Sequence, residues 1–190
     1  NRVEVITNGI DACDRAMRIE RKKIIYVGRS TNDKRIPLIF DVARKIGDDY
    51  DFTLVTDSNK FSNVPENVTI KVKLSDEELR KEYMSSSIFL TASYREGFSI
   101  ASLEAMGFSL PVLYIRSPFN QAMEEVVRDG YNGFACSGID EVISRIHDLE
   151  NLKLYSDMST NAYNFATERT WDNIARKYET YLVEKIEGKQ

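Results

Sequence analysis

Two glutamates, Glu96 and Glu104, have the spacing in this chain that most clearly suggests chemistry. If a helix starts near Ser99, Glu104 lies about 7.5 Å along it, while Glu96 sits in the loop that leads into it. Both carboxylates can then border one ligand at the helix N-terminus, where Glu104 would accept hydrogen bonds from a ribose and Glu96 from sugar hydroxyls. The alternative is that both are ordinary solvated side chains, as most glutamates are.

The start of that predicted helix is also a candidate anion site. The backbone N–H groups of Phe98, Ser99 and Ile100 would lack helical partners, and the helix dipole adds positive potential at this end. Gly97 has no side chain and would let a ligand approach the backbone closely. We therefore expect negative charge to bind here.

A second candidate anion site is the loop 28–34, of sequence GRSTNDK. Arg29 can present a bidentate fork and Lys34 a point charge, so together they suit a diphosphate. The loop matches neither the P-loop pattern nor the GxGxxG dinucleotide fingerprint. The alternative is that both cations simply lie on a solvated loop beside Asp33.

Short runs rich in branched and aromatic residues alternate with helical patterns along the chain. The runs that predict strands are 23–27, 52–56, 68–72, 88–92 and 112–115. The patterns that predict helices are 34–46, 75–85, 99–108, 120–128, 139–149, 152–167 and 171–186. This alternation indicates an α/β, Rossmann-like domain, an open parallel sheet with helices on both faces and further helices at its C-terminal end. Ligands bind beyond the carboxyl ends of such strands, where the loop 28–34 must lie.

Local signals support individual helices. Ser75 and Glu78 form a capping-box pattern, and Pro37 stands in a first turn, where its missing N–H costs little. The apolar residues of the last helix, among them Trp171 and Tyr178, recur every three to four positions and predict a packing surface.

Composition excludes several classes of protein. The 190 residues predict one domain, and a net charge of −4 disfavours nucleic-acid binding. No apolar run is long enough to span a membrane, and no secretory pattern opens the sequence. Cys13 and Cys136 form no CxxC pair, so we expect neither a disulfide framework nor a metal site, and a reduced, cytoplasmic location fits best. His147, the single histidine, is predicted to be an exposed helix residue.

Several motifs, taken in order, resemble the C-terminal nucleotide-sugar-binding domain of the retaining GT-B glycosyltransferases of family 4, also described as glycosyl transferases group 1. They are Gly28-Arg29-x4-Lys34, the EX7E pattern from Glu96 to Glu104 followed by Ala105-Met106-Gly107, and Glu125-Val126-Val127-x-Asp129-Gly130-x-Asn132-Gly133-Phe134. The resemblance implies an interdomain linker over residues 1–20 and the donor domain over residues 21–190. It also implies an N-terminal acceptor domain that this sequence does not contain.

Position by position, the resemblance implies roles for the candidate residues. Arg29 and Lys34 would hold the donor diphosphate, and Glu104 would bind the ribose hydroxyls. Glu96 would contact the donor sugar near its reacting face, which makes it the catalytic candidate. The turn at Val72 and Lys73 would border the base. Members of this family typically transfer with retention of configuration, and the resemblance also implies a site that requires no metal or other cofactor.

The resemblance therefore predicts the donor half of an enzyme that moves a hexose from a UDP- or GDP-sugar to a lipid, glycan or protein acceptor. The 190 residues alone should bind the donor but transfer sugar poorly, and any peripheral association with the cytoplasmic membrane face would come through the missing part. Departures at Ser99, Ala101, Val72 and Thr56 place bulk near the donor pocket and leave the sugar open. Two alternatives remain, a non-catalytic nucleotide-binding or regulatory module and an enzyme like the nucleotide-sugar 2-epimerases.

Overall fold

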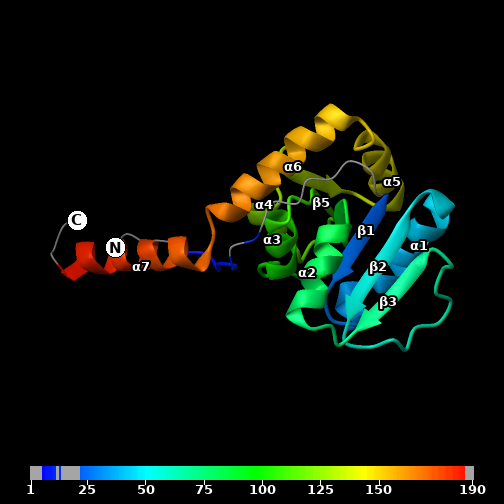
Figure 1. Cartoon of the computed structure of the whole chain (residues 1–190), viewed down its shortest axis with the longest axis horizontal. Helices are drawn as coiled ribbons and strands as arrows, with labels where there is room; N and C mark the ends of the chain where they lie inside the picture. The colour runs from blue at the N-terminus through cyan, green and yellow to red at the C-terminus, as the bar shows by residue number, and fades with distance from the viewer. Residues whose placement is uncertain (1–5, 12, 14–21, 187–190) are drawn as a thin grey trace.

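The computed structural model describes residues 6–11, 13 and 22–186, and it has the expected α/β architecture (Figure 1). One sheet holds six parallel strands in the order β3-β2-β1-β4-β5-β6. The strands are β1 (Lys23–Val27), β2 (Asp51–Thr56), β3 (Val68–Val72), β4 (Ile88–Thr91), β5 (Val112–Ile115) and β6 (Gly133–Cys136). The chain therefore builds outward from β1 to one edge and then returns to start the other half at β4, which is the Rossmann-like arrangement.

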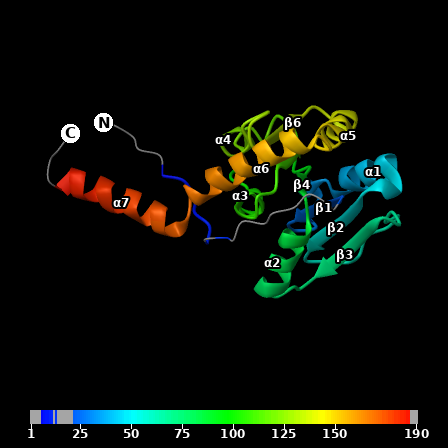
Figure 2. The same ribbon diagram turned by 45° about the horizontal axis from the view of Figure 1, so that its top comes forward.

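Helices cover both faces of this sheet, as Figure 2 shows. They are α1 (Ile36–Ile46), α2 (Asp76–Ser85), α3 (Ile100–Gly107), α4 (Met123–Val126), α5 (Ile139–Asp148), α6 (Leu152–Thr167) and α7 (Trp171–Ile186). Ile24 of β1 belongs to a buried cluster with α1 and α5, whereas Ile25 belongs to a second cluster with α3. Successive strand side chains point to opposite faces, so the run of branched residues in β1 supplies both cores.

The sequence located most elements, and the capping box at the start of α2 is confirmed. The Ser75 hydroxyl accepts the N–H of Glu78, whose carboxylate accepts the N–H of Ser75. The strands 23–27, 68–72 and 112–115 and the helices 152–167 and 171–186 have the predicted bounds.

Three expectations need correction. Strand β6 was not predicted, because Gly133 and three small or apolar neighbours give a weak strand signal. The helix expected over 120–128 is only the single turn α4, because the side chain of Asn120 binds backbone carbonyls outside any helix. The helix expected from Lys34 begins at Ile36, because Lys34 ends a 3-10 turn and Arg35 adopts a left-handed conformation with φ 47°.

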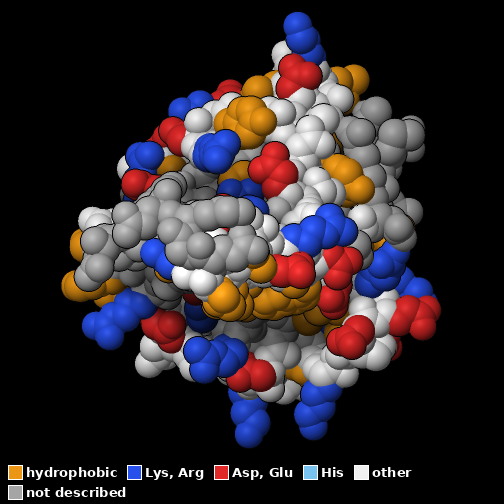
Figure 3. All heavy atoms as spheres, turned by 90° about the vertical axis from the view of Figure 1, so that its left-hand side faces the viewer, with side chains coloured by type: hydrophobic (Ala, Val, Ile, Leu, Met, Phe, Trp, Pro, Cys, Tyr) orange, Lys and Arg blue, Asp and Glu red, His pale blue; other side chains and the backbone are white. Residues whose placement is uncertain are grey.

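Helix α7 projects away from the rest of the described chain (Figures 1 and 2). The segment 6–11 lies beside its start, where Ile10 accepts the N–H of Trp171 and donates to Arg169 O. The predicted packing stripe is mostly exposed in this chain, since Ile174 is its buried member while Trp171 and Tyr178 are exposed. Figure 3 views the molecule from this side and shows hydrophobic side chains among charged ones. None of the described helices combines the length and apolarity that a membrane span requires.

Candidate functional site

A cavity of about 200 Å³ lies where the strand order reverses, between the carboxyl ends of β1 and β4. Its lining residues come from the end of β1, the loop 28–34, β4, the loop that follows β4 and the start of α3. They are Tyr26, Val27, Gly28, Arg29, Lys34, Phe89, Thr91, Ser93, Glu96, Ser99, Ile100 and Ala101. This is the position at which open parallel sheets bind ligands. Small-molecule pockets typically measure about 300–1,000 Å³, so this half-open space would hold only part of a nucleotide sugar.

Lys34 and Glu96, which are 62 residues apart in sequence, form an ion pair inside this cavity. Lys34 Nζ lies 2.8 Å from Glu96 Oε2, and the two side chains are 14% and 16% exposed. Arg29 lines the same cavity, and no described carboxylate forms an ion pair with it. The lining thus carries two cations and one carboxylate, which leaves a net positive charge suited to an anion.

The backbone of the loop 28–34 is fixed by contacts with β1 and β2. The Tyr26 hydroxyl donates to Arg29 O at 2.9 Å, and Ser30 N–H donates to Asp57 Oδ1 at 2.7 Å. A Cβ at Gly28 would come within 2.6 Å of the Tyr26 hydroxyl, so glycine is required there for space. The loop therefore presents Arg29 from a defined position rather than from a free surface turn.

The start of α3 keeps part of the expected anion site. Ile100 N–H donates to Phe98 O, so that group is not available, contrary to expectation. The N–H groups of Phe98 and Ser99 have no partner among the described residues, and Ser99 Oγ caps the helix by accepting Ser102 N–H. A Cβ on Gly97 would meet nothing within 4 Å, so the glycine leaves open space beside these groups. Gly97 and Phe98 border the cavity lining without belonging to it.

The loop that carries Glu96 is held by residues that the sequence analysis did not single out as functional. Asn120, which is buried, donates to Ser93 O and Ile115 O at 2.8 and 2.9 Å, and its amide oxygen accepts Ser117 N–H. Glu96 N–H donates to Phe119 O at 3.3 Å. These contacts join the carboxyl ends of β4 and β5 and fix the backbone from which Glu96 extends.

Arg35 also forms hydrogen bonds with backbone carbonyls at these strand ends. Its guanidinium donates to Ala92 O at 2.5 Å and to Ile115 O at 3.3 Å, and it lies 5.5 Å from the centre of the Tyr94 ring. Burial lowers the pKa of Arg35. The unusual left-handed backbone of Arg35 was not predictable from sequence, because non-glycine residues rarely adopt it.

Glu104 has a different environment from Glu96. It lies one helical turn beyond Ile100 on the same side of α3, but it is not among the residues that line the cavity. Its Oε2 accepts the hydroxyl of Tyr83, a fully buried residue of α2, at 3.1 Å. Burial raises the pKa of Glu104, the hydrogen bond from Tyr83 opposes this, and the charges of Asp11 and Asp76 add to the increase.

Val72 and Lys73 lie at the carboxyl end of β3, the edge strand, two strands away from β1. Lys73 has φ 55° and is exposed, and neither residue lines the cavity. The predicted site residues thus lie at the carboxyl ends of the strands. The ones that line a common space are Arg29, Lys34, Glu96, Ser99 and Ile100.

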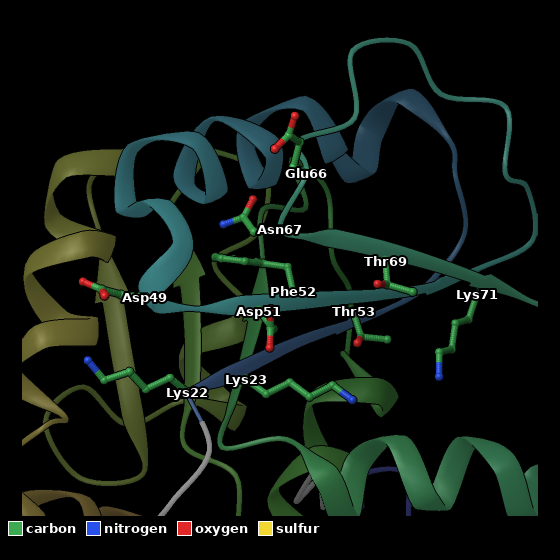
Figure 4. Close-up of a pocket in the computed structure, with 10 residues that line it drawn as sticks. All are labelled: Lys22, Lys23, Asp49, Asp51, Phe52, Thr53, Glu66, Asn67, Thr69 and Lys71. Carbon is green, nitrogen blue, oxygen red and sulfur yellow. The ribbon is translucent and has the colours of Figure 1, made fainter.

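A larger open groove of about 630 Å³ contains none of the predicted site residues (Figure 4). It lies over the amino-terminal half of β1, β2 and β3, away from the strand ends where ligands bind. Two of its lysines, Lys23 and Lys71, already pair with Glu82 of α2 at 2.9 and 2.6 Å. We therefore assign the candidate site to the smaller cavity. Within the described residues, no three His, Cys, Asp or Glu side chains are arranged to hold a metal ion.

Comparisons with known proteins identify the family and the fold. The family model for glycosyl transferases group 1 matches residues 14–165. The uncharacterized glycosyltransferase MJ1178 of Methanocaldococcus jannaschii is 27% identical over 184 residues, which cover 90% of this chain and 51% of the relative. The chain therefore spans about half the length of this curated relative.

Two solved structures share the fold. A point mutant of S. aureus TarM, crystallised with fondaparinux, α-GlcNAc-glycerol and UDP, superposes with a TM-score of 0.79 at 20% identity, covering 93% of this chain and 38% of that chain. The C-terminal domain of the group 1 glycosyl transferase LpcC from Francisella tularensis superposes with a TM-score of 0.69 at 18% identity, covering 85% of this chain and 98% of that chain.

Proposed function

The chain belongs to the glycosyl transferases group 1 family, and we propose that it is the donor-binding half of a GT-B hexosyltransferase. In this proposal it binds a UDP- or GDP-sugar, and the complete enzyme transfers the sugar, with retention of configuration, to a lipid, glycan or protein acceptor. The observation that carries the proposal is the cavity at the strand-order reversal, which brings Arg29, Lys34 and Glu96 to the N–H groups at the start of α3. TarM, which shares the fold, was crystallised with UDP.

The charges of the cavity suggest how the donor would be held. Arg29 and Lys34 would bind the diphosphate and stabilise its negative charge as the bond to the sugar breaks. The N–H groups of Phe98 and Ser99 would add to that stabilisation, and Gly97 would allow the close approach that this requires. We propose that these groups supply the positive potential without a metal or cofactor.

Glu96 is the proposed catalytic residue. Positive charge develops on the sugar as the diphosphate leaves, and a carboxylate held at that face stabilises it. The ion pair with Lys34 holds the Glu96 carboxylate in a partly enclosed space and orients it toward the cavity. Lys34 would contact both the diphosphate and the carboxylate that faces the sugar.

Glu104 and the end of β3 would complete the nucleotide site. We propose that Glu104 binds the ribose hydroxyls and that Val72 and Lys73 border the base. The acceptor would bind to an N-terminal domain outside residues 21–190, with residues 1–20 as the linker. The match to nearly the whole of the crystallised LpcC domain supports this division. The cytoplasmic location, peripheral to the membrane for a lipid acceptor, remains a prediction.

A thermal-shift panel of UDP, GDP, ADP and their sugar conjugates tests the proposal, because a ligand that binds only the native state raises the melting temperature. We expect at least one nucleoside diphosphate to stabilise the protein, and Arg29→Ala to remove most of that stabilisation. Arg44→Ala, which removes an exposed cation paired with Asp41, is the matched control and should leave the shift unchanged. A folded protein that none of these nucleotides stabilises would refute the donor-binding role.

A successful panel would still leave enzyme and binding module to be separated. Joining the chain to its acceptor domain should restore sugar transfer, whereas the 190 residues alone should bind the donor and transfer poorly. Nucleotide binding without turnover in the joined protein would favour a regulatory module, and a 2-epimerised product would favour an epimerase.

A further inference from the structure

Tyr83 is a buried residue of α2 that the proposed function does not use. Its side chain is 2% exposed, and its ring stacks on that of Phe108 with 5.2 Å between the ring centres. Its hydroxyl lies 3.1 Å from Glu104 Oε2 and 3.4 Å from Ala101 O. A hydroxyl has one proton to donate, so the shorter and charged contact to Glu104 is favoured.

The other oxygen of Glu104 is differently placed. Oε1 has no hydrogen-bond partner among the described residues, although the side chain is half-buried. A partly buried carboxylate oxygen without a donor is costly unless a ligand or water supplies one. Glu104 therefore has one oxygen fixed by the protein and one oxygen available.

We propose that Tyr83 is a positioning residue of the donor site, whose hydroxyl holds Glu104 Oε2 so that Oε1 accepts a hydrogen bond from the ribose of a nucleoside diphosphate. This inference rests on the proposed function, since it needs Glu104 to bind ribose. The benefit is preorganisation, because a glutamate that is already held in one conformation loses less side-chain entropy when the ligand binds.

The titratable groups around the pair predict a pH dependence. Tyr83 stays protonated because burial raises its pKa well above the ordinary value. Glu104 faces Tyr83 and Asp76 from α2 and Asp11 from the N-terminal segment, and Cys13 lies near Tyr83. The ribose contact requires the carboxylate, so affinity is complete above the raised pKa of Glu104 and is lost as the pH falls through it.

The test is calorimetric titration of UDP, or of GDP if UDP does not bind, into wild type and Tyr83→Phe across the acid pH range. Phenylalanine keeps the stacking on Phe108 and removes only the hydroxyl. We expect the dissociation constant at neutral pH to rise about tenfold. Loss of the hydrogen bond also raises the pKa of Glu104, so affinity should begin to fall at a higher pH than in wild type.

Two controls separate positioning from packing. Tyr155→Phe removes another buried hydroxyl, which donates to Ser87 O at 3.0 Å, and it should change neither the affinity nor its pH dependence. In a Glu104→Gln background, Tyr83→Phe should cause much less than its tenfold loss, because the charged acceptor is already gone.

The outcomes distinguish this inference from the proposed function. If wild type binds no nucleoside diphosphate, the proposed function fails. If wild type binds but Tyr83→Phe binds with the same affinity and the same pH dependence, the positioning role alone is wrong. A melting temperature measured for each variant shows whether it is folded. If Tyr83→Phe does not fold, the test is the pH dependence of nucleotide affinity in Glu104→Gln. If affinity in Glu104→Gln varied with pH as it does in wild type, the inference would be overturned.

Discussion

Glu96 and Glu104 are eight residues apart, and the structure gives them opposite surroundings. Glu96 lies on a loop, pairs with Lys34 at 2.8 Å and lines the cavity. Glu104 lies on a helix and accepts a hydrogen bond from the hydroxyl of a buried tyrosine. Its pKa is raised, and burial is the main cause. The Glu96 carboxylate is stabilised by a cation that a diphosphate would also attract, whereas Glu104 is held by a neutral donor.

In our proposal, this difference in surroundings corresponds to two different functions within one motif. A carboxylate paired with a cation that also attracts a diphosphate can respond when the ligand charge arrives and the sugar bond breaks. A carboxylate held by a neutral hydroxyl provides a fixed acceptor whose role is complete once the nucleotide is bound. We therefore expect changes at Glu96 to affect the rate of transfer and changes at Glu104 to affect nucleotide affinity.

The largest expected effect is that of Glu96→Gln on transfer. In a protein that contains both domains, kcat should fall by about a hundredfold or more, because a neutral amide stabilises developing positive charge poorly. Steady-state kinetics with a saturating donor measures this. Glu82→Gln, a carboxylate that pairs with two lysines outside the cavity, serves as the control and should retain kcat. Equal kcat values for wild type and Glu96→Gln would contradict the catalytic role proposed for Glu96.

Asn120→Ala should have the next largest effect, and it should impair the function of Glu96 without affecting that of Glu104. The change removes an amide that contacts Ser93, Ile115 and Ser117, and we expect it to lower the free energy of unfolding by about 2–3 kcal/mol. Because the loop bearing Glu96 loses its anchor, kcat should fall while the affinity for the nucleoside diphosphate changes little.

Asn67→Ala provides a matched control for this prediction. The Asn67 amide also bonds three backbone carbonyls, but at the opposite end of the strands. It should destabilise the protein in chemical denaturation without lowering kcat. If Asn120→Ala lowered stability with kcat unchanged, Asn120 would be a structural residue only.

Gly97→Ala should have the smallest effect on the fold and a clear effect on binding. A Cβ at this position meets nothing within 4 Å, so the free energy of unfolding should change by less than about 0.5 kcal/mol. A bound phosphate would meet the added methyl group, and the dissociation constant should rise about threefold or more. Gly133→Ala is the contrast, since its Cβ would lie 2.0 Å from Val112 O and should destabilise the sheet. Unchanged affinity in Gly97→Ala would place the diphosphate elsewhere.

The sequence predicted the fold because its signals are local. Branched runs such as 68–72 and the Ser75 capping box act within a few residues, so they identify elements without tertiary information. Strand β6 was missed because its pairing with β5 depends on the space that Gly133 leaves, which is a tertiary property. Helix α4 is short because Asn120 bonds distant carbonyls rather than its own helix.

The site was predictable in its residue types but not in its contacts. Spacing and the family resemblance indicated Arg29, Lys34, Glu96 and Glu104, and the first three line one cavity. The pairing of Lys34 with Glu96 and of Tyr83 with Glu104 joins residues on different elements, so no local pattern could predict it. Arg35 was missed because it bonds carbonyls that are distant in sequence and because non-glycine residues rarely adopt its left-handed backbone conformation.

The most direct test of the two-glutamate account is one calorimetric comparison, in which the nucleoside diphosphate selected by the thermal-shift panel is titrated into wild type, Glu96→Gln and Glu104→Gln at neutral pH. The account predicts a dissociation constant about tenfold or more higher in Glu104→Gln and within about twofold of wild type in Glu96→Gln. Equal losses in both variants, or a loss confined to Glu96→Gln, would contradict it.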